Sequence, residues 1–223
     1  MSFLRQVSTV ARRDLRIEGR AGEVGSVVLP FAAAAVFVVP LATNTLEVRL
    51  ADLAWPVFWL VALLFGMQVA LRQTGTESQT QRRHLVLLGV DPAARFGGRA
   101  LTAAMLMLLV LVVTAPLVVL FYNPDTVPPV LPGLGILILF APGLAMLATL
   151  AGDVTVGLRA RSALAPLLVA PMSVPLLVGA SRAFGAVGRE DGTLTAVLLL
   201  VIADLALAAS AALTARSLEN TTT

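Results

Sequence analysis

The feature that most constrains this chain is a series of six apolar runs. They cover residues 25–43, 53–71, 100–122, 130–152, 163–181 and 193–212. A helix needs about 20 apolar residues to cross a hydrocarbon core of ~30 Å. Within lipid, only helices and closed barrels pair all of their backbone groups. The unbroken apolar runs therefore predict an all-α membrane protein, with a six-helix transmembrane domain over residues 25–213 and a tail over 214–223.

Composition narrows the chemistry that the chain can perform. Only 13% of the residues are charged, about half the share that a soluble domain uses. There is no cysteine, and His84 is the single histidine. Thiolate zinc sites, histidine clusters and Ser-His-Asp sets are thereby excluded. No catalytic or metal-binding residue and no resident cofactor is predicted, and an intramembrane enzyme is the least favoured class.

The basic residues are all arginine. The chain contains 16 of them and no lysine. A P-loop needs a lysine to reach the terminal phosphates of ATP. If ATP drives this protein, a partner chain must bind it. The few arginines are read as determinants of membrane orientation rather than of nucleic-acid binding.

The arginines also predict the orientation of the spans. Thirteen lie in the N-terminal segment, in residues 72–99 and 153–162, and in the tail. The three others, Arg49, Arg182 and Arg189, fall on the opposite side. Because cytoplasmic loops carry the excess of positive charge, both termini are expected in the cytoplasm.

Residues 1–24 are expected to form an amphipathic helix at the membrane interface. At helical spacing, its apolar residues gather on one side and its arginines on the other. Asp14 and Glu18, one turn apart, interrupt the apolar side and are expected to face arginines elsewhere in the protein. The residues assigned to this interfacial helix are Arg12, Arg13, Asp14, Arg16 and Glu18.

Residues 72–99 form the longest predicted cytoplasmic loop. We expect a short helix through Glu77–Leu88 and then a turn at the Asp-Pro pair. Three leucines make an apolar knob on this polar loop, which is typical of a docking element for a partner; packing against its own bundle is the alternative. The candidate partner-contacting residues are Glu77, Arg83, Leu85, Leu87, Leu88, Asp91 and Pro92.

Two features inside the spans are candidates for function. Pro171 and Pro175 lie one turn apart in the fifth span, where each removes a backbone hydrogen bond and favours a kinked or mobile helix. Asp204 lies near the middle of the sixth span, where a carboxylate is costly. For both features, a purely structural role in helix packing is the alternative.

One segment resembles a known family. Residues 157–181 read GLRARSALAPLLVAPMSVPLLVGAS. They are similar to the signature of the haem exporter B family of cytochrome c maturation (CcmB), in which a glycine-containing turn precedes LLVLPLxxPVLIFG. LLVAPM replaces LLVLPL here. The matching positions are Leu167, Leu168, Val169, Pro171, Pro175, Leu177 and Gly179.

The resemblance implies a function. Members of this family are ABC-2-type permeases, which pair as homodimers or with another membrane subunit above two copies of a cytoplasmic ABC ATPase. It implies a chain of the bacterial inner membrane that works with other cytochrome c maturation proteins, with haem as possible cargo. The loop at 72–99 then becomes the coupling loop. A permease for a lipid, drug or polysaccharide and a non-transporting membrane scaffold are the alternatives.

Overall fold

The computed structural model describes residues 2–43, 49–75, 91–155, 161–189 and 194–220. These residues form seven α-helices and one short π-helical segment, and contain no strand. The expected all-α fold is confirmed. The helices are α1 (Phe3–Ala21), α2 (Leu29–Thr43), α3 (Leu50–Gly75), α5 (Pro92–Tyr122), α6 (Val130–Val154), α7 (Arg161–Gly188) and α8 (Leu194–Asn220), with the π-helical turn η1 at Val24–Val28.

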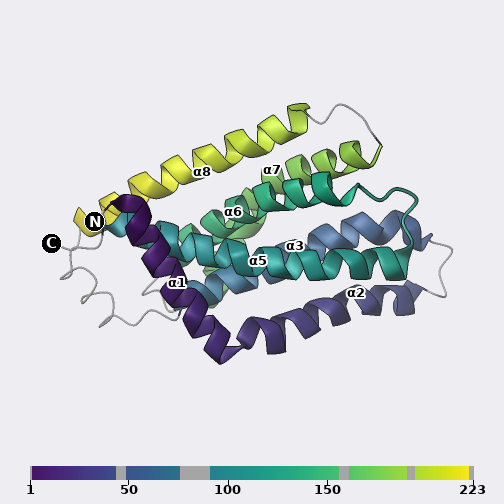
Figure 1. Cartoon of the computed structure of the whole chain (residues 1–223), viewed down its shortest axis with the longest axis horizontal. Helices are drawn as coiled ribbons and strands as arrows, with labels where there is room; N and C mark the ends of the chain where they lie inside the picture. Colours follow the sequence, from purple (N-terminus) through teal and green to yellow (C-terminus); the bar gives the residue numbers. More distant parts are fainter. Residues whose placement is uncertain (1, 44–48, 76–90, 156–160, 190–193, 221–223) are drawn as a thin grey trace.

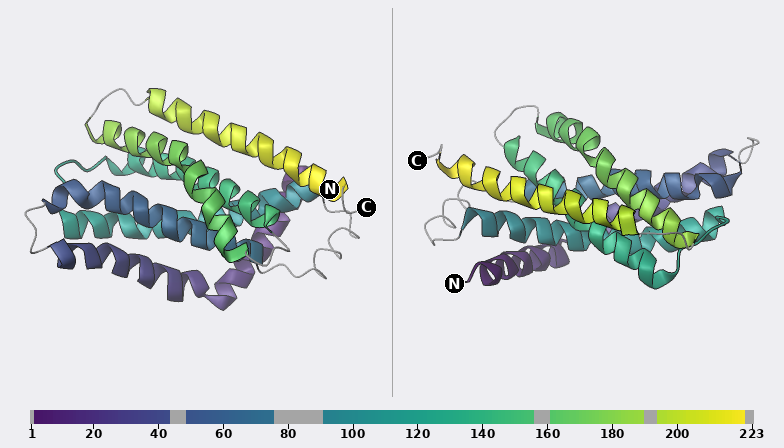
Figure 2. Two further views of the ribbon diagram at one scale, coloured as in Figure 1. Left: turned by 180° about the vertical axis from the view of Figure 1, so that it is seen from behind. Right: turned by 90° about the horizontal axis from the view of Figure 1, so that it is seen from above.

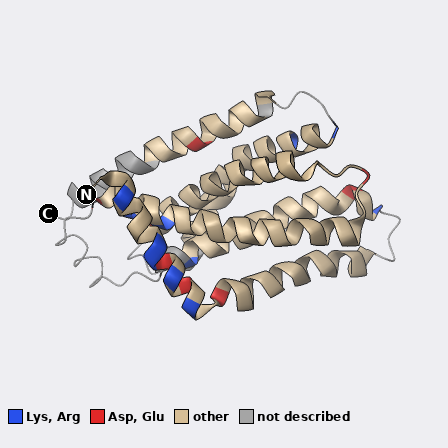
Figure 3. Cartoon of the chain, viewed as in Figure 1, with Lys and Arg blue, Asp and Glu red and all other residues tan. Residues whose placement is uncertain are grey.

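The helices from α2 to α8 run up and down the long axis of the molecule, each antiparallel to the one before it (Figure 1). Helix α1 crosses this bundle obliquely at one end, where both chain termini lie (Figure 1). The charged residues gather on α1 (Figure 3). We call this the basic end, comprising α1, residues 91–99 and residues 149–155. The opposite end, with residues 49–59, 122–133 and 184–189, is called the aromatic end.

Five helical stretches are long and apolar enough to cross a membrane. In α8, the apolar stretch over the described residues is shorter, at Val197–Ser210. The chain is therefore a multi-pass integral membrane protein. The five stretches are Val24–Thr43, Leu50–Arg72, Pro92–Tyr122, Val130–Val154 and Leu164–Gly188.

Several helices extend beyond the predicted spans. Residues 72–75 continue α3, and α5 begins at Pro92 rather than at residue 100, so both ends of the predicted loop at 72–99 are helical. Residues 182–188 belong to α7 rather than to a loop, and residues 214–220 belong to α8 rather than to a free tail. Hydropathy detects only the part of a helix that suits lipid. Most of these extensions are polar, and the start of α5 is covered by another helix, so hydropathy did not detect them.

Helices α5 and α6 form the centre of the bundle. Helix α5 contacts α1, α2, α3, α6 and α8, and α6 contacts α3, α7 and α8 as well. Small residues line the buried face of α6, including Gly133, Ala141, Gly143, Ala145 and Ala148. Without a hydrophobic force between helices in lipid, such residues stabilise a bundle by letting the backbones approach closely.

Prolines are accommodated inside five of the helices rather than ending them. Pro40 in α2 has no N–H to offer the carbonyl of Val36 one turn earlier. The Tyr122 hydroxyl of α5 donates to that carbonyl at 2.9 Å, and the tyrosine is buried. Helix α7, with Pro166, Pro171 and Pro175, stays continuous but is visibly bent (Figure 2).

The turn from α1 into α2 has two local determinants. Gly22 ends α1 in the left-handed conformation at φ 64°, which glycine adopts without a steric cost. The Glu18 carboxylate then accepts a hydrogen bond from the Val24 backbone N–H at 2.6 Å. Glu18 therefore satisfies an otherwise orphaned donor at the start of η1. The expectation that Glu18 faces an arginine is replaced by this backbone contact.

Candidate functional site

The basic end brings together three elements that are distant in the sequence: α1, the start of α5 and the end of α6. Of the predicted partner-contacting residues, Glu77, Arg83, Leu85, Leu87 and Leu88 lie outside the described residues. Asp91 and Pro92 are described, and they form the junction between the loop and the bundle.

Asp91 and Pro92 start a helix rather than an isolated turn. The Asp91 carboxylate accepts from the Ala93 N–H at 2.8 Å as the N-cap of α5, and Pro92 occupies the first helical position. Both residue types are preferred there, because the cap supplies a missing acceptor and proline has no N–H to leave unpaired. The Asp91 N–H donates to the Gln6 side chain of α1 at 3.1 Å. Asp91 is thus held by α1 and α5 together.

Helix α1 lies close against α5 because α5 carries two glycines there. A Cβ atom on Gly98 would come within 2.6 Å of Val10, whereas one on Gly97 would come no nearer than 3.4 Å to Val7. Val10 is buried in this contact. The Thr102 hydroxyl of α5 donates to the Ala11 carbonyl at 3.3 Å. Helix α1 is therefore packed on α5, and its placement in the membrane interface stays a prediction.

A buried ion pair joins α5 to α6. Arg99 Nη2 donates to Asp153 Oδ2 at 2.5 Å, and the two side chains are only 5% and 9% exposed. Charges removed from water in this way are stable only when they are paired. The pair therefore links the start of α5 to the end of α6 through two charges that are both shielded from solvent.

The arginines of α1 point the other way. Arg12 and Arg16 are exposed, and Arg13 and Asp14 are half-buried. Among the described residues, none of the α1 arginines forms an ion pair or donates a side-chain hydrogen bond. The cationic face of α1 is thus available to an anionic partner.

Asp204 lies between α8 and α6. Its Oδ1 atom is buried without a hydrogen-bond partner among the described residues. A Cβ atom on Gly143 of α6 would overlap this carboxylate and approach Leu176 of α7. The glycine leaves a notch that admits the aspartate, so Asp204 marks the point where α6, α7 and α8 meet.

Pro171 and Pro175 lie on the exposed side of α7. The buried side of the same helix carries Val169, Ser173 and Leu176. The Ser173 hydroxyl donates to the Ala170 carbonyl at 2.8 Å. The prolines and Asp204 are thus on neighbouring helices, α7 and α8.

Sequence reasoning missed Gln6, Gly98 and the pairing of Arg99 with Asp153. The double glycine at 97–98 was a usable signal, because adjacent glycines inside a helix favour close approach of another backbone. The pairing of two charges 54 residues apart leaves no local pattern. No group of three histidine, aspartate or glutamate residues suited to a metal ion occurs in the described part of the chain.

Comparison with known proteins gives one clear result. The family model described as CcmB protein matches residues 5–219, from α1 to the last turn of α8. No curated protein matches the chain.

Proposed function

The chain belongs to the CcmB family, and on this premise we propose that it is the permease subunit of an ABC transporter complex that handles haem for cytochrome c maturation. A separate ATPase energises the complex. The observation that best supports this proposal is the extent of the family match, which includes α1, the helices of the bundle and the residues on both sides of the predicted coupling loop. Membership in this family implies a haem exporter permease component.

The proposed topology has six spans, with α8 as the sixth. Helix α8 has 27 residues, which at 1.5 Å per residue is about 40 Å long and enough to cross the core. Both termini lie at the basic end (Figure 1). The excess of arginine at this end supports placing it in the cytoplasm. The protein would then lie in the bacterial inner membrane.

In the proposed mechanism, two ATPase subunits act on the loop that ends at Asp91. This chain has no lysine with which to build its own P-loop, so it is not an enzyme by itself and ATP is held by the partner. A displacement of the loop reaches α1 through Gln6 and α5 through the Asp91 cap. The Arg99–Asp153 pair carries it to α6.

Helix α7 is the proposed moving element within the bundle. Pro171 and Pro175 each remove one backbone hydrogen bond, in two consecutive turns of α7. The loss of these bonds lowers the resistance of the helix to bending. The permease works as a homodimer or beside another membrane subunit, together with other cytochrome c maturation proteins. Haem is the proposed cargo.

Co-purification with the candidate ATPase tests the coupling proposal. Leu87→Asp places a charge in the apolar knob and should abolish complex formation and the ATPase response to the membrane subunit. The control, Val127→Asp, adds the same charge at an exposed residue of the aromatic end and should leave both unchanged. Normal complex formation and ATPase coupling with Leu87→Asp would contradict the assignment.

Cytochrome analysis tests the haem proposal separately. Deleting the gene should deplete cytochromes with covalently bound haem, measured by haem staining of membrane proteins, and expression of the intact chain should restore them. Normal levels in the deletion strain would argue against a role in cytochrome c maturation, even if the ATPase complex forms.

A further inference from the structure

The carboxyl group of Asp204 lies at a place that offers it no polar partner. The residue is near the middle of the apolar stretch of α8, which covers Val197–Ser210. Its Oδ1 atom is buried and forms no hydrogen bond with a described residue. Asp204 also takes no part in the ion pairs of the described residues. Because a buried carboxylate is normally stabilised by such partners, the surroundings decide which form of this group is stable.

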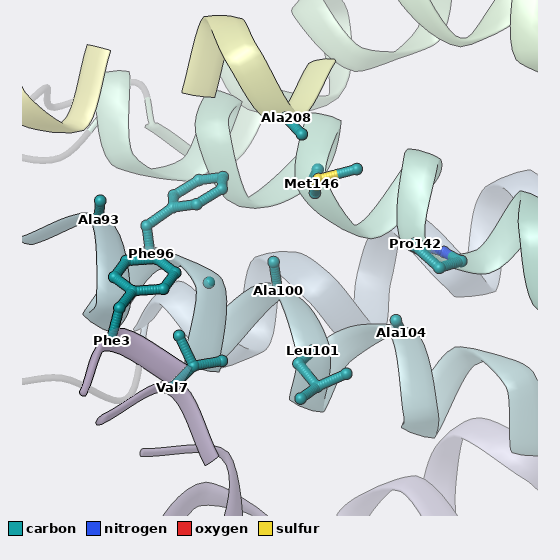
Figure 4. A pocket seen from close by; sticks show the side chains of 11 residues that line it. Phe3, Val7, Ala93, Phe96, Ala100, Leu101, Ala104, Pro142, Met146 and Ala208 are labelled. Carbon is teal, nitrogen blue, oxygen red and sulfur yellow. The ribbon is translucent and has the colours of Figure 1, made fainter. Parts of the chain in front are cut away.

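The surroundings of Asp204 are apolar on the three helices that pack against α8, which are α5, α6 and α7. On α6, the carboxyl group occupies the notch above Gly143, and Leu176 of α7 borders the same notch. One turn further along α8, Ala208 lies in a groove of about 330 Å³ together with Ala104 of α5 (Figure 4). Every side chain that lines this groove is apolar. The protein side of the contact therefore offers no group that solvates a charge.

The outer side of α8 is apolar as well. Ile202 and Leu205, which flank Asp204 in the sequence, are both exposed. In the proposed topology α8 is the sixth span, so these side chains face hydrocarbon rather than water. Asp204 is therefore enclosed between an apolar helix interface and lipid.

The charged residues of these four helices lie toward the helix ends. Asp153 is ten residues from Gly143 along α6, about 15 Å at 1.5 Å per residue, and is paired with Arg99. Arg182 is six residues from Leu176 along α7, about 9 Å, and is exposed. None of the ion pairs among described residues includes Asp204, so no described arginine neutralises a carboxylate there. The full set is Arg95 and Arg99 of α5, Asp153 of α6, Arg161 and Arg182 of α7, and Arg216 and Glu219 of α8.

An ionised carboxylate without a partner is unfavourable in apolar surroundings, and such a group takes up a proton instead. We propose that Asp204 is a proton-binding site within the membrane, occupied while α8 packs on Gly143 of α6. When α8 moves away from α6 and water reaches the carboxyl group, the O–H bond breaks, the electron pair stays on Asp204 and water accepts the proton. Proton release thus accompanies the separation of α8 from α6. The inference rests on the proposed six-span topology, and not on the ATPase or on haem.

Infrared spectroscopy of the full chain in lipid bilayers tests the proton. At about pH 6, ordinary aspartate and glutamate side chains are ionised, so the carbonyl band of a protonated carboxylic acid identifies the site. We expect this band in the unchanged protein and its loss in Asp204→Asn. The control Asp52→Asn removes an exposed carboxylate in the first turn of α3 and should keep the band. Absence of the band from the unchanged protein, or its survival in Asp204→Asn, would overturn the site.

Distances between two spin labels test the coupling to helix packing. The cysteine-free chain permits labels at Val38→Cys of α2 and Leu198→Cys of α8, two exposed residues on helices at opposite sides of the bundle (Figure 1). As the pH rises from about 6 to about 9, the carboxylic acid band should fade and a second, longer distance should appear. In Asp204→Asn, which cannot ionise, the single distance should persist. An identical response to pH in the two proteins would overturn the coupling.

Two glycines on α6 test the geometry of the site with the same labels. The added methyl group of Gly143→Ala overlaps the carboxyl group of Asp204, so the longer distance should already be present at about pH 6. The matched control, Gly135→Ala, places its methyl group where no atom lies within 4 Å, and the single distance should remain. Equal distances in the two variants would show that Asp204 does not occupy the notch.

The sixth span is tested separately, by reporter proteins fused to the two ends of the chain. Reporters on opposite sides of the membrane would contradict the six-span topology and the inference with it. Reporters on the same side, combined with no carboxylic acid band, would overturn the proton site alone. Because neither measurement uses the ATPase or haem, a failure of the proposed transport function leaves both results interpretable.

Discussion

The two ends of the bundle each contain an arginine–aspartate pair, but in opposite surroundings. Arg99 and Asp153 at the basic end are 5% and 9% exposed and lie 2.5 Å apart. Arg49 and Asp125 at the aromatic end are 68% and 63% exposed, at 3.2 Å. A buried pair is costly to break, because the remaining charge has lost its compensation. An exposed pair contributes little, because water and salt screen it.

The comparison shows that the ends are held together by different forces. The basic end relies on directed polar contacts among α1, α5 and α6. The aromatic end relies on rings: Phe184 of α7 lies 4.8 Å from Trp55, 5.6 Å from Trp59 and 5.9 Å from Phe58 of α3, between ring centroids. Ring packing tolerates small displacements, whereas a buried ion pair does not. This contrast fits the proposed path of a displacement from Asp91 to α6, which runs through the basic end.

The largest expected effect is from breaking the buried pair. Asp153→Ala should lower the free energy of unfolding by about 3–5 kcal/mol, because it removes the carboxylate that compensates buried Arg99. Unfolding in mixed micelles with increasing denaturing detergent measures it. Replacing Arg99 and Asp153 together by methionine and leucine should cost much less. If Asp153→Ala alone lowered the free energy of unfolding by less than about 1 kcal/mol, the pair would not be a rigid link between α5 and α6.

The next effect concerns the contact of α1 with α5. Gly98→Ala should cost about 1–3 kcal/mol, because the added methyl overlaps Val10. Gly97→Ala is the matched control: its methyl meets Val7 at an ordinary distance, so the change should be neutral or stabilising through helix propensity. The same unfolding assay compares them. Equal effects at the two glycines would mean that α1 does not pack as described.

A smaller effect is expected at the aromatic end from Tyr122→Phe. The variant leaves the Val36 carbonyl without its donor, since Pro40 offers no N–H. Hydrogen bonds between membrane helices contribute about 0.6 kcal/mol on average and up to about 1.7. In a Pro40→Ala background the helix supplies the missing N–H, and the cost of Tyr122→Phe should largely vanish. Identical costs in the two backgrounds would rule out this compensation.

The smallest effect should come from the exposed pair. Arg49→Ala is expected to cost about 0.2–1 kcal/mol at low salt, and the difference from the unchanged protein should shrink as salt is raised to 1 M. Measuring unfolding at both salt concentrations tests this. A loss as large as that of Asp153→Ala would remove the contrast between the two ends.

Much of the fold is predictable from the sequence, because lipid imposes a simple rule on the chain. Runs of apolar residues long enough to cross the core become helices, and the arginine-rich start becomes an amphipathic helix. The ends of these helices are less predictable. The start of α5 at Pro92 contains two arginines and two glycines yet is helical, since Asp91 caps it and α1 covers it.

The candidate site is predictable only in part. Asp91 and Pro92 can be recognised in the sequence because an Asp-Pro pair predicts a turn. Pro171 and Pro175 can be recognised because they lie one helical turn apart. The partners of Asp91 and Asp204 are set by helix packing: Gln6 lies 85 residues before Asp91, and Gly143 opposes Asp204 only because α6 and α8 are neighbours. Such contacts leave no trace in a window of a few residues.

The distance in sequence between Gln6 and Asp91 also bears on how the protein is made. At about 5–20 residues per second, the ribosome needs roughly 4–17 seconds to add the 85 residues that separate the two partners. During this interval α1 has emerged but its seat on α5 does not exist. A bilayer surface binds an amphipathic helix of this kind without help from α5. The same apolar face of α1 thus suits a membrane surface while the chain is being made, and α5 once that helix is in place.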